Sequence, residues 1–180
     1  MKKGLFFTFF LAFTITGFTQ SFTPINTGST IQFGIKNFGS KVTGTFTGLS
    51  GFILYNPLKI SSTIFNVQID ATTINTGNAA RDKHLKKEDY FNVSTFKIMS
   101  FLSSKVTATA DAAVFKVEGY LTIKGIKKVV SFPFTIQPNG SGGYFFTGEF
   151  IINRKDYTVG GSSLVLADNV TVSLKINGSK

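Results

Sequence analysis

Residues 31–52 read I-Q-F-G-I-K-N-F-G-S-K-V-T-G-T-F-T-G-L-S-G-F. In the first part, Ile31, Phe33 and Ile35 are each separated by one polar or small residue. This period of two places successive side chains on opposite faces of an extended chain, so it predicts a half-buried β-strand. Residues 37–40, N-F-G-S, then supply a turn signal, because Asn and Gly tolerate the positive φ of a tight reversal. The alternation resumes after the turn, so the stretch predicts two consecutive antiparallel strands.

The same period of two continues through most of the chain. Alternating runs lie at residues 64–70, 115–123, 130–136, 144–152 and 170–176, and turn signals lie at 56–57, 76–78, 138–143 and 168–169. Thr, Val, Ile and Phe, which fit a pleated sheet, predominate in these runs. Closing such a meander into a barrel removes the exposed edges of an open sheet. We therefore predict an all-β fold, a closed antiparallel barrel of about eight strands, with an open sandwich as the alternative.

Residues 70–95 depart from the period of two. Asn78 fits a helix N-cap, and residues 79–89 are polar and charged without Gly or Pro, which predicts a short helix between strands. This segment contains Arg81 and His84, the only His of the chain. A charged interruption in a barrel rich in Phe and Thr is where we expect specificity for a ligand.

The N-terminus has the order of a secretory signal peptide. Lys2 and Lys3 precede an apolar run at residues 5–15, and small and polar residues follow at 17–20. The apolar run is shorter than the roughly 20 residues that cross a bilayer. We expect residues 1–19 to be a signal peptide and residues 20–180 to form a single domain of a periplasmic or secreted protein.

The composition excludes several kinds of site. Without Cys and with one His, thiol chemistry is impossible and neither a metal site nor a cofactor is expected. The net charge of +10, which includes Lys2 and Lys3, serves solubility and favours anionic partners such as a phosphate head group or an acidic membrane surface, touched transiently. The lysines form no basic stripe, so we expect no nucleic acid. The oligomeric state is left open, with a homodimer as one option.

Catalysis has few candidate residues. His84 with Ser or carboxylate partners is the one candidate set, but the chain has no G-x-S-x-G nucleophile motif. We therefore predict a binding protein rather than an enzyme, with a hydrolase that uses His84 as the alternative. An outer-membrane barrel is another alternative, although Lys and Glu interrupt several strands.

The aromatic content leaves two interpretations of the barrel interior. Such side chains fill the core of a small barrel, or they line a cavity that holds a ligand. In the second case we expect ligand contacts from alternating strand positions, namely Phe33, Phe46, Phe65, Val67, Leu121 and Phe132. Arg81 and His84 would lie near the mouth, where Arg81 meets an anionic head group. Otherwise Arg81 and Asp82 form a surface pair, or a salt bridge with Asp156 or Arg154.

Four ordered segments together resemble the signature of the YceI-like family of exported lipid-binding proteins. They are T-I-N-T-G-N-A-A-R-D-K-H-L-K-K-E-D-Y-F-N-V at 73–93, G-Y-L-T-I-K-G-I-K-K-V-V at 119–130, F-I-I-N-R-K-D-Y-T-V-G at 150–160, and the hairpin at 31–51. The resemblance implies a lipocalin-like barrel with a long apolar tunnel. It also implies polyisoprenoid ligands, such as isoprenoid quinones or prenyl pyrophosphates, or fatty-acid-like ligands.

The resemblance also implies roles for particular residues. Arg81, Asp82, His84 and Leu85 occupy the R-D-x-H-L positions of the family, and Arg154 and Asp156 match its late motif; Leu85 thereby joins the expected ligand contacts. Burying one CH2 group contributes about 0.8 kcal/mol, so ten apolar carbons contribute roughly 8 kcal/mol, which ordering and association costs partly offset. We therefore expect an exported, non-enzymatic carrier of a long-chain lipid.

Overall fold

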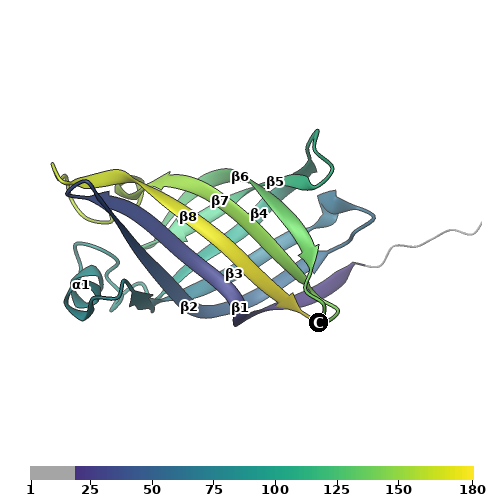
Figure 1. Cartoon of the computed structure of the whole chain (residues 1–180), viewed down its shortest axis with the longest axis horizontal. Helices are drawn as coiled ribbons and strands as arrows, with labels where there is room; N and C mark the ends of the chain where they lie inside the picture. The colour runs from purple at the N-terminus through teal and green to yellow at the C-terminus, as the bar shows by residue number, and fades with distance from the viewer. Residues whose placement is uncertain (1–18) are drawn as a thin grey trace, which may run out of the picture.

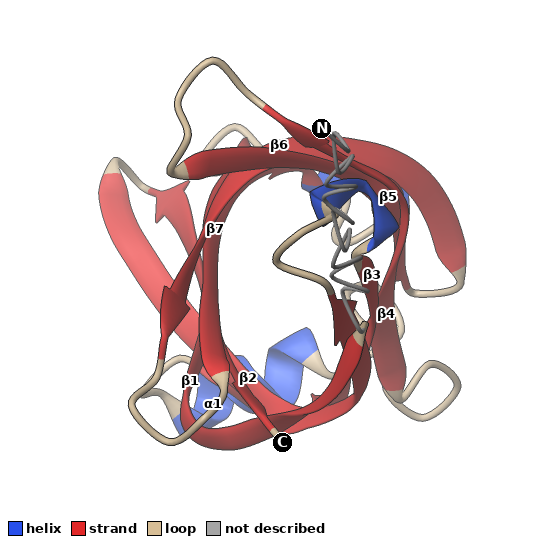
Figure 2. Cartoon of the chain, turned by 90° about the vertical axis from the view of Figure 1, so that its right-hand side faces the viewer, coloured by secondary structure: helices blue, strands red, loops and turns tan. Residues whose placement is uncertain are grey.

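The computed structural model describes residues 19–180, so the predicted signal peptide lies outside the described residues except for its last position. Eight antiparallel strands follow one another around a closed barrel, and β1 pairs with β8 to complete it (Figure 1, Figure 2). The strands are β1 (Gln20–Asn37), β2 (Ser40–Tyr55), β3 (Ile64–Asn75), β4 (Ile98–Ala108), β5 (Val114–Ile123), β6 (Ile126–Pro138), β7 (Tyr144–Asn153) and β8 (Leu166–Ser179). The predicted closed barrel is confirmed.

Three short helices interrupt the strands: η1 (Ile60–Ser62), α1 (Ala79–Leu85) and η2 (Arg154–Tyr157). The Oδ1 of Asn78 accepts a hydrogen bond from the Arg81 N–H at 3.0 Å, so Asn78 is the N-cap that the sequence predicts. α1 ends at Leu85, short of the predicted residue 89, because Tyr90 and Phe91 turn back to pack against the barrel core. None of the helices in residues 19–180 has the length and apolar run that crossing a membrane requires.

Two details of the strand prediction are wrong. The turn signal at residues 168–169 lies inside β8, where Asn169 pairs with Asn153 of β7. Asp168 forms salt bridges there with Arg154 and Lys155. The second detail is that β4 is missing from the predicted runs. It shows no clean alternation because its pairing with β5 shifts register between Ser103 and Lys105, so the residues on either side do not keep one period.

Aromatic rings close one end of the barrel. The ring of Tyr144 lies 4.9 Å from that of Tyr55 and 5.5 Å from that of Phe22, both edge-on. Phe65 packs edge-on against Phe134 at 5.3 Å and Phe146 at 5.4 Å. These residues come from the beginning or end of their strands, at the end of the barrel opposite α1 (Figure 1). The ring cluster fills this end with protein side chains.

Glycines in β2 allow close contacts and a positive φ within the strand. The ring of Phe33 covers Gly44, its partner in the β1–β2 ladder, so closely that any Cβ at Gly44 would collide with it. Gly48 has a φ of 72°, within a stretch where the pairing of β2 with β3 shifts register.

Candidate ligand cavity

The half of the barrel nearest α1 contains a cavity of about 230 Å³. Every strand contributes residues to its wall, and so do α1 and the segments at 90–91 and 154–166. The inward side chains Ile69, Phe101 and Leu121 are only half-buried although they belong to the core, because they face the cavity instead of other side chains. The barrel is therefore filled at one end and hollow at the other.

Most of the residues that the sequence predicts as ligand contacts line this cavity. They are Phe33, Phe46, Val67, Leu121 and Phe132 from the strands, and Arg81 and Leu85 from α1. In α1, Arg81 and Leu85 are four residues apart and so share the helix face that is turned to the cavity. Their contact with a ligand remains a prediction.

Two of the predicted residues do not line the cavity. Phe65 belongs to the aromatic cluster at the closed end, because it lies near the start of β3. His84 is exposed, and its ring lies 4.8 Å from that of Tyr90, which does line the cavity. Alternation along a strand indicates which side chains point into the barrel, but not how far along the barrel axis they lie. It therefore could not distinguish Phe65 at the closed end from Phe33 at the cavity. Sequence reasoning also missed Phe150, Ile152, Val172 and Leu174, whose period of two was visible.

Arg81 is held at the mouth by Thr76. Its Nε donates to the Thr76 hydroxyl at 2.8 Å, and its Nη2 donates to the Thr76 carbonyl at 2.9 Å. The same hydroxyl donates to the Oδ1 of Asp82 at 2.6 Å, so Arg81 and Asp82 are linked through Thr76. Neither forms the salt bridge with Asp156 or Arg154 that the sequence suggested. Within residues 19–180 the Nη1 of Arg81 donates to no protein atom, so it can meet an anionic group at the mouth.

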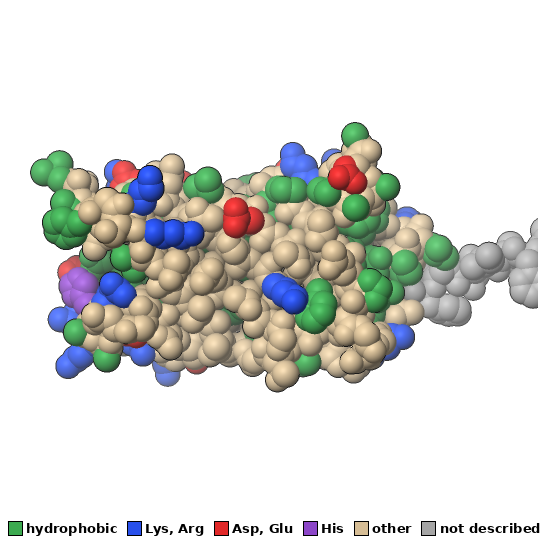
Figure 3. Space-filling view, viewed as in Figure 1, with side chains coloured by type: hydrophobic (Ala, Val, Ile, Leu, Met, Phe, Trp, Pro, Cys, Tyr) green, Lys and Arg blue, Asp and Glu red, His purple; other side chains and the backbone are tan. Residues whose placement is uncertain are grey.

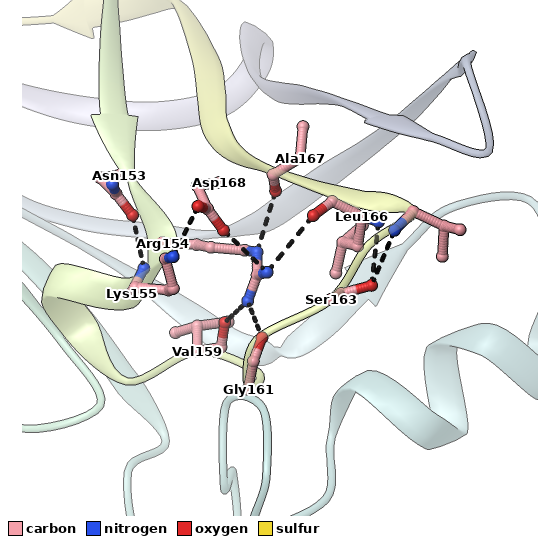
Figure 4. Close-up of polar contacts among 10 residues, drawn as sticks. Asn153, Arg154, Lys155, Val159, Gly161, Ser163, Leu166, Ala167 and Asp168 are labelled. Carbon is pink, nitrogen blue, oxygen red and sulfur yellow. Dashed lines mark hydrogen bonds and ion pairs between the residues drawn. The ribbon is translucent and has the colours of Figure 1, made fainter.

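Arg154, on the other side of the mouth, is a structural residue (Figure 4). Only 3% of its surface is exposed, and its guanidinium donates to the carbonyls of Val159, Gly161, Leu166 and Ala167. Its charge pairs with Asp168 at 3.0 Å, and not with Asp156 of the same motif. The side chain thereby fixes the loop between η2 and β8, which forms one rim of the cavity.

One wall of the cavity depends on a pair of rings. The β6–β7 ladder runs from Pro138 and Tyr144 to Phe134 and Gly148, and the described residues form no further pairs toward the mouth. There the rings of Phe132 and Phe150 stack with centroids 4.3 Å apart. Both rings line the cavity, and both also line a cleft on the outer surface. The stack therefore separates the cavity from solvent where the strands do not pair.

The polar groups at the cavity include the phenol of Tyr157 and the guanidinium of Arg81. Burial, with a contribution from Asp156, raises the pKa of Tyr157 to about 12, so this cavity-lining phenol stays neutral. No group of three or more His, Asp or Glu side chains within residues 19–180 could hold a metal ion. The site offers an apolar interior and one available guanidinium group.

Comparisons with known proteins agree with this geometry. The family described as YceI-like domain matches residues 22–178. A UPF0312 protein of Pseudomonas aeruginosa is 32% identical over 135 residues, which cover 72% of this chain and 70% of that protein. The crystal structure of Burkholderia cenocepacia BcnA has a TM-score of 0.80 at 23% identity, covering 86% of this chain and 98% of that one. The structure of a polyisoprenoid binding domain from Saccharophagus degradans has a TM-score of 0.69 at 15% identity, covering 88% of this chain and 97% of that one.

Proposed function

This chain belongs to the YceI-like family, and from that premise we propose that it is an exported, non-enzymatic carrier of a lipid with a long apolar tail, of the isoprenoid class. The observation that carries the proposal is the apolar cavity in a barrel that is closed at one end. The structural similarity to a polyisoprenoid binding domain supports the isoprenoid class. Export is supported by the sequence pattern at residues 1–19.

The cavity volume limits how much of the tail is enclosed. An apolar cavity of about 150 Å³ accommodates a benzene ring, so 230 Å³ accommodates on the order of ten carbons. Burial of ten apolar carbons contributes roughly 8 kcal/mol before ordering costs, which is enough for reversible binding without a covalent step. A longer isoprenoid would extend through the mouth or displace the rings that line the wall.

The available Nη1 of Arg81 favours a ligand with an anionic head group. A prenyl pyrophosphate provides one and an isoprenoid quinone does not. A fatty acid is the second candidate, because its carboxylate could accept the same hydrogen bond and its tail suits a cavity of modest volume. The hydrolase alternative has less support, because His84 is exposed and lies behind Tyr90, outside the cavity wall.

The first test is to recover the protein from cells that express the full-length chain and to identify extracted lipids by mass spectrometry. We expect a stoichiometric lipid with a long tail. N-terminal sequencing of the same material tests whether residues 1–19 are removed. Protein that is empty and takes up neither isoprenoids nor fatty acids would refute the proposal.

The second test compares Arg81→Met with Lys83→Met, a matched change at an exposed residue of the same helix. We expect Arg81→Met to weaken binding of a prenyl pyrophosphate or a fatty acid about 10- to 100-fold, because a charge-assisted hydrogen bond is lost. Binding of a neutral quinone should not change, and Lys83→Met should affect none of these ligands. Equal affinities in the two variants would contradict the head-group role of Arg81.

A further inference from the structure

Three exposed apolar side chains gather at the rim of the cavity. Phe38, in the turn between β1 and β2, is 76% exposed, and Leu164 and Val165, in the loop before β8, are 106% and 40% exposed. The Phe38 N–H donates to the Val165 carbonyl at 2.9 Å, so the two loops lie side by side. Figure 3 shows hydrophobic side chains at the tip of the end that α1 occupies. We call Phe38, Leu164 and Val165 the apolar tip.

Folding of the barrel does not account for the apolar tip. Phe38 has a φ of 48°, in the left-handed region that bulky residues rarely adopt, and its ring gains little from burial. Asn or Gly would suit this turn better. Single exposed apolar residues are common on protein surfaces, but a cluster on two adjacent loops is typical of a surface that meets a partner.

The apolar tip is part of the cavity mouth. Asn37 and Leu166, which flank the tip in the sequence, pair with each other in the β1–β8 ladder. Both of them line the cavity, as does Arg81 on α1. Whatever binds the tip would therefore lie directly against the opening through which a ligand must pass.

Basic side chains surround this end of the barrel. Lys36 and Lys41 flank the Phe38 turn, and Lys83, Lys86 and Lys87 lie in and just after α1. Two carboxylates at this end are engaged within the protein, since Asp168 pairs with Arg154 and Lys155 and Asp82 accepts from Thr76. Glu88, Asp89 and Asp156 are exposed here, but the lysines, which also include Lys124 and Lys155, outnumber them. Lys and Arg side chains are accordingly prominent at the same end in Figure 3. Apolar side chains beside exposed lysines are complementary to a bilayer with anionic head groups.

We propose that the mouth of the barrel docks on the surface of an anionic lipid bilayer, with the apolar tip in the head-group region and the lysines against phosphates. This orientation aims the cavity at the membrane, so that a lipid tail can pass between bilayer and cavity without crossing water. The inference deepens the proposed carrier function. Only the purpose of docking, which is lipid transfer, rests on that function. Contact with vesicles can be measured whether or not a ligand is present.

The chain contains no Trp, so a single introduced Trp reports its own surroundings. The test uses Phe38→Trp in full-length protein recovered from expressing cells, with Leu58→Trp as the matched control. Leu58 is also exposed, at 67%, but precedes η1 at the closed end. Vesicles of phosphatidylglycerol and phosphatidylethanolamine should shift the emission of Phe38→Trp to the blue, and phosphatidylcholine vesicles should do so much less. Leu58→Trp should not respond to either.

Further variants measure the two contributions in a vesicle sedimentation assay. Phe38→Ser and Leu164→Ser should each weaken binding roughly tenfold, because each removes an apolar side chain from the head-group region. Lys36→Gln and Lys41→Gln should each weaken binding about fivefold, with a loss of this difference at high salt. Circular dichroism checks that each variant is folded.

Several outcomes would overturn the docking proposal. One is an equal response of Phe38→Trp and Leu58→Trp, or a response of neither. Another is a dimer that depends on Phe38 and does not respond to vesicles, since a second copy of the chain would then cover the apolar tip. Lipid extraction from the same preparations keeps the two proposals apart. Bound lipid without a vesicle response refutes docking alone, and a vesicle response by protein that takes up no lipid refutes the carrier function alone.

Discussion

Replacing Arg154 with Met should destabilise the barrel and release one rim of the cavity. The guanidinium of Arg154 is almost fully buried and donates to four carbonyl groups and to Asp168. Met keeps much of the apolar volume of the side chain but has no donors. The variant therefore leaves the carbonyls of the loop between η2 and β8 without their partner.

The expected magnitude depends on the environment in which the substitution leaves the carboxylate of Asp168. Breaking a buried charge pair costs about 3–5 kcal/mol when the remaining partner stays buried. Asp168 is 37% exposed and keeps Lys155 at 2.6 Å, so its carboxylate is not stranded and the cost lies at the lower limit. We expect a loss of about 3 kcal/mol in the free energy of unfolding, or roughly 6–12 °C in Tm for a domain of this size.

Lys155→Met is the matched control. The neighbouring Lys155 also pairs with Asp168, but its side chain is 44% exposed, and such exposed pairs contribute about 0–1 kcal/mol. Urea unfolding followed by circular dichroism measures both variants, and hydrogen exchange of residues 159–167 measures the loop directly. If Arg154→Met costs no more than Lys155→Met, or if exchange in the loop is unchanged, Arg154 does not hold the rim.

Two further predictions concern the cavity. Leu121→Trp should fill cavity space and abolish lipid uptake, at a cost of about 1–3 kcal/mol in the free energy of unfolding. Tyr120→Trp, on the outer face of the same strand, should bind lipid normally. Equal lipid uptake by the two variants would show that the ligand lies elsewhere. The Tyr157 pKa, raised from 10.0 to about 12, favours the neutral phenol in the folded state, so its contribution is complete below pH 10 and is lost as the pH rises toward 12. In Tyr157→Phe the stability difference between pH 9 and pH 12 should shrink by on the order of 2–3 kcal/mol; urea midpoints that fall as steeply as in the wild type would contradict this.

Local patterns were sufficient to predict the barrel and the start of its helix. Alternation and turn residues act over neighbouring positions, which is why residues 31–52 could be interpreted as two strands before any contact was known. The N-cap at Asn78 is equally local, since its acceptor serves a donor three residues away. In α1, a step of about 100° per residue turns His84 away from the direction of Leu85, but the sequence does not say which direction faces the cavity.

Long-range partners could not be predicted in the same way. Arg154 and Asp168 are separated by a loop whose path depends on where β8 begins, and the turn signal at 168–169 placed that loop too late. The role of Arg154 therefore appears only when the carbonyl groups of the loop are brought around its guanidinium (Figure 4). In the sequence, Arg154 stood only as a match to the late motif and as a salt-bridge partner for Asp82, and neither indicates the carbonyl groups that it binds.

The level at which an inward side chain lies in the barrel decides whether it packs in the closed end or lines the cavity. An eight-stranded barrel is just wide enough either to be filled by its own side chains or to hold one small ligand. At the closed end the inward positions are aromatic, and rings such as Tyr55, Tyr144 and Phe146 contact one another across the interior. Toward the mouth, both aromatic and aliphatic side chains, among them Phe33, Phe150 and Val172, line the cavity. The sequence contains both sets of residues, but only the register of the strands assigns each residue to its level. A cavity in such a barrel is therefore predictable once the register is known, and not from periodicity alone.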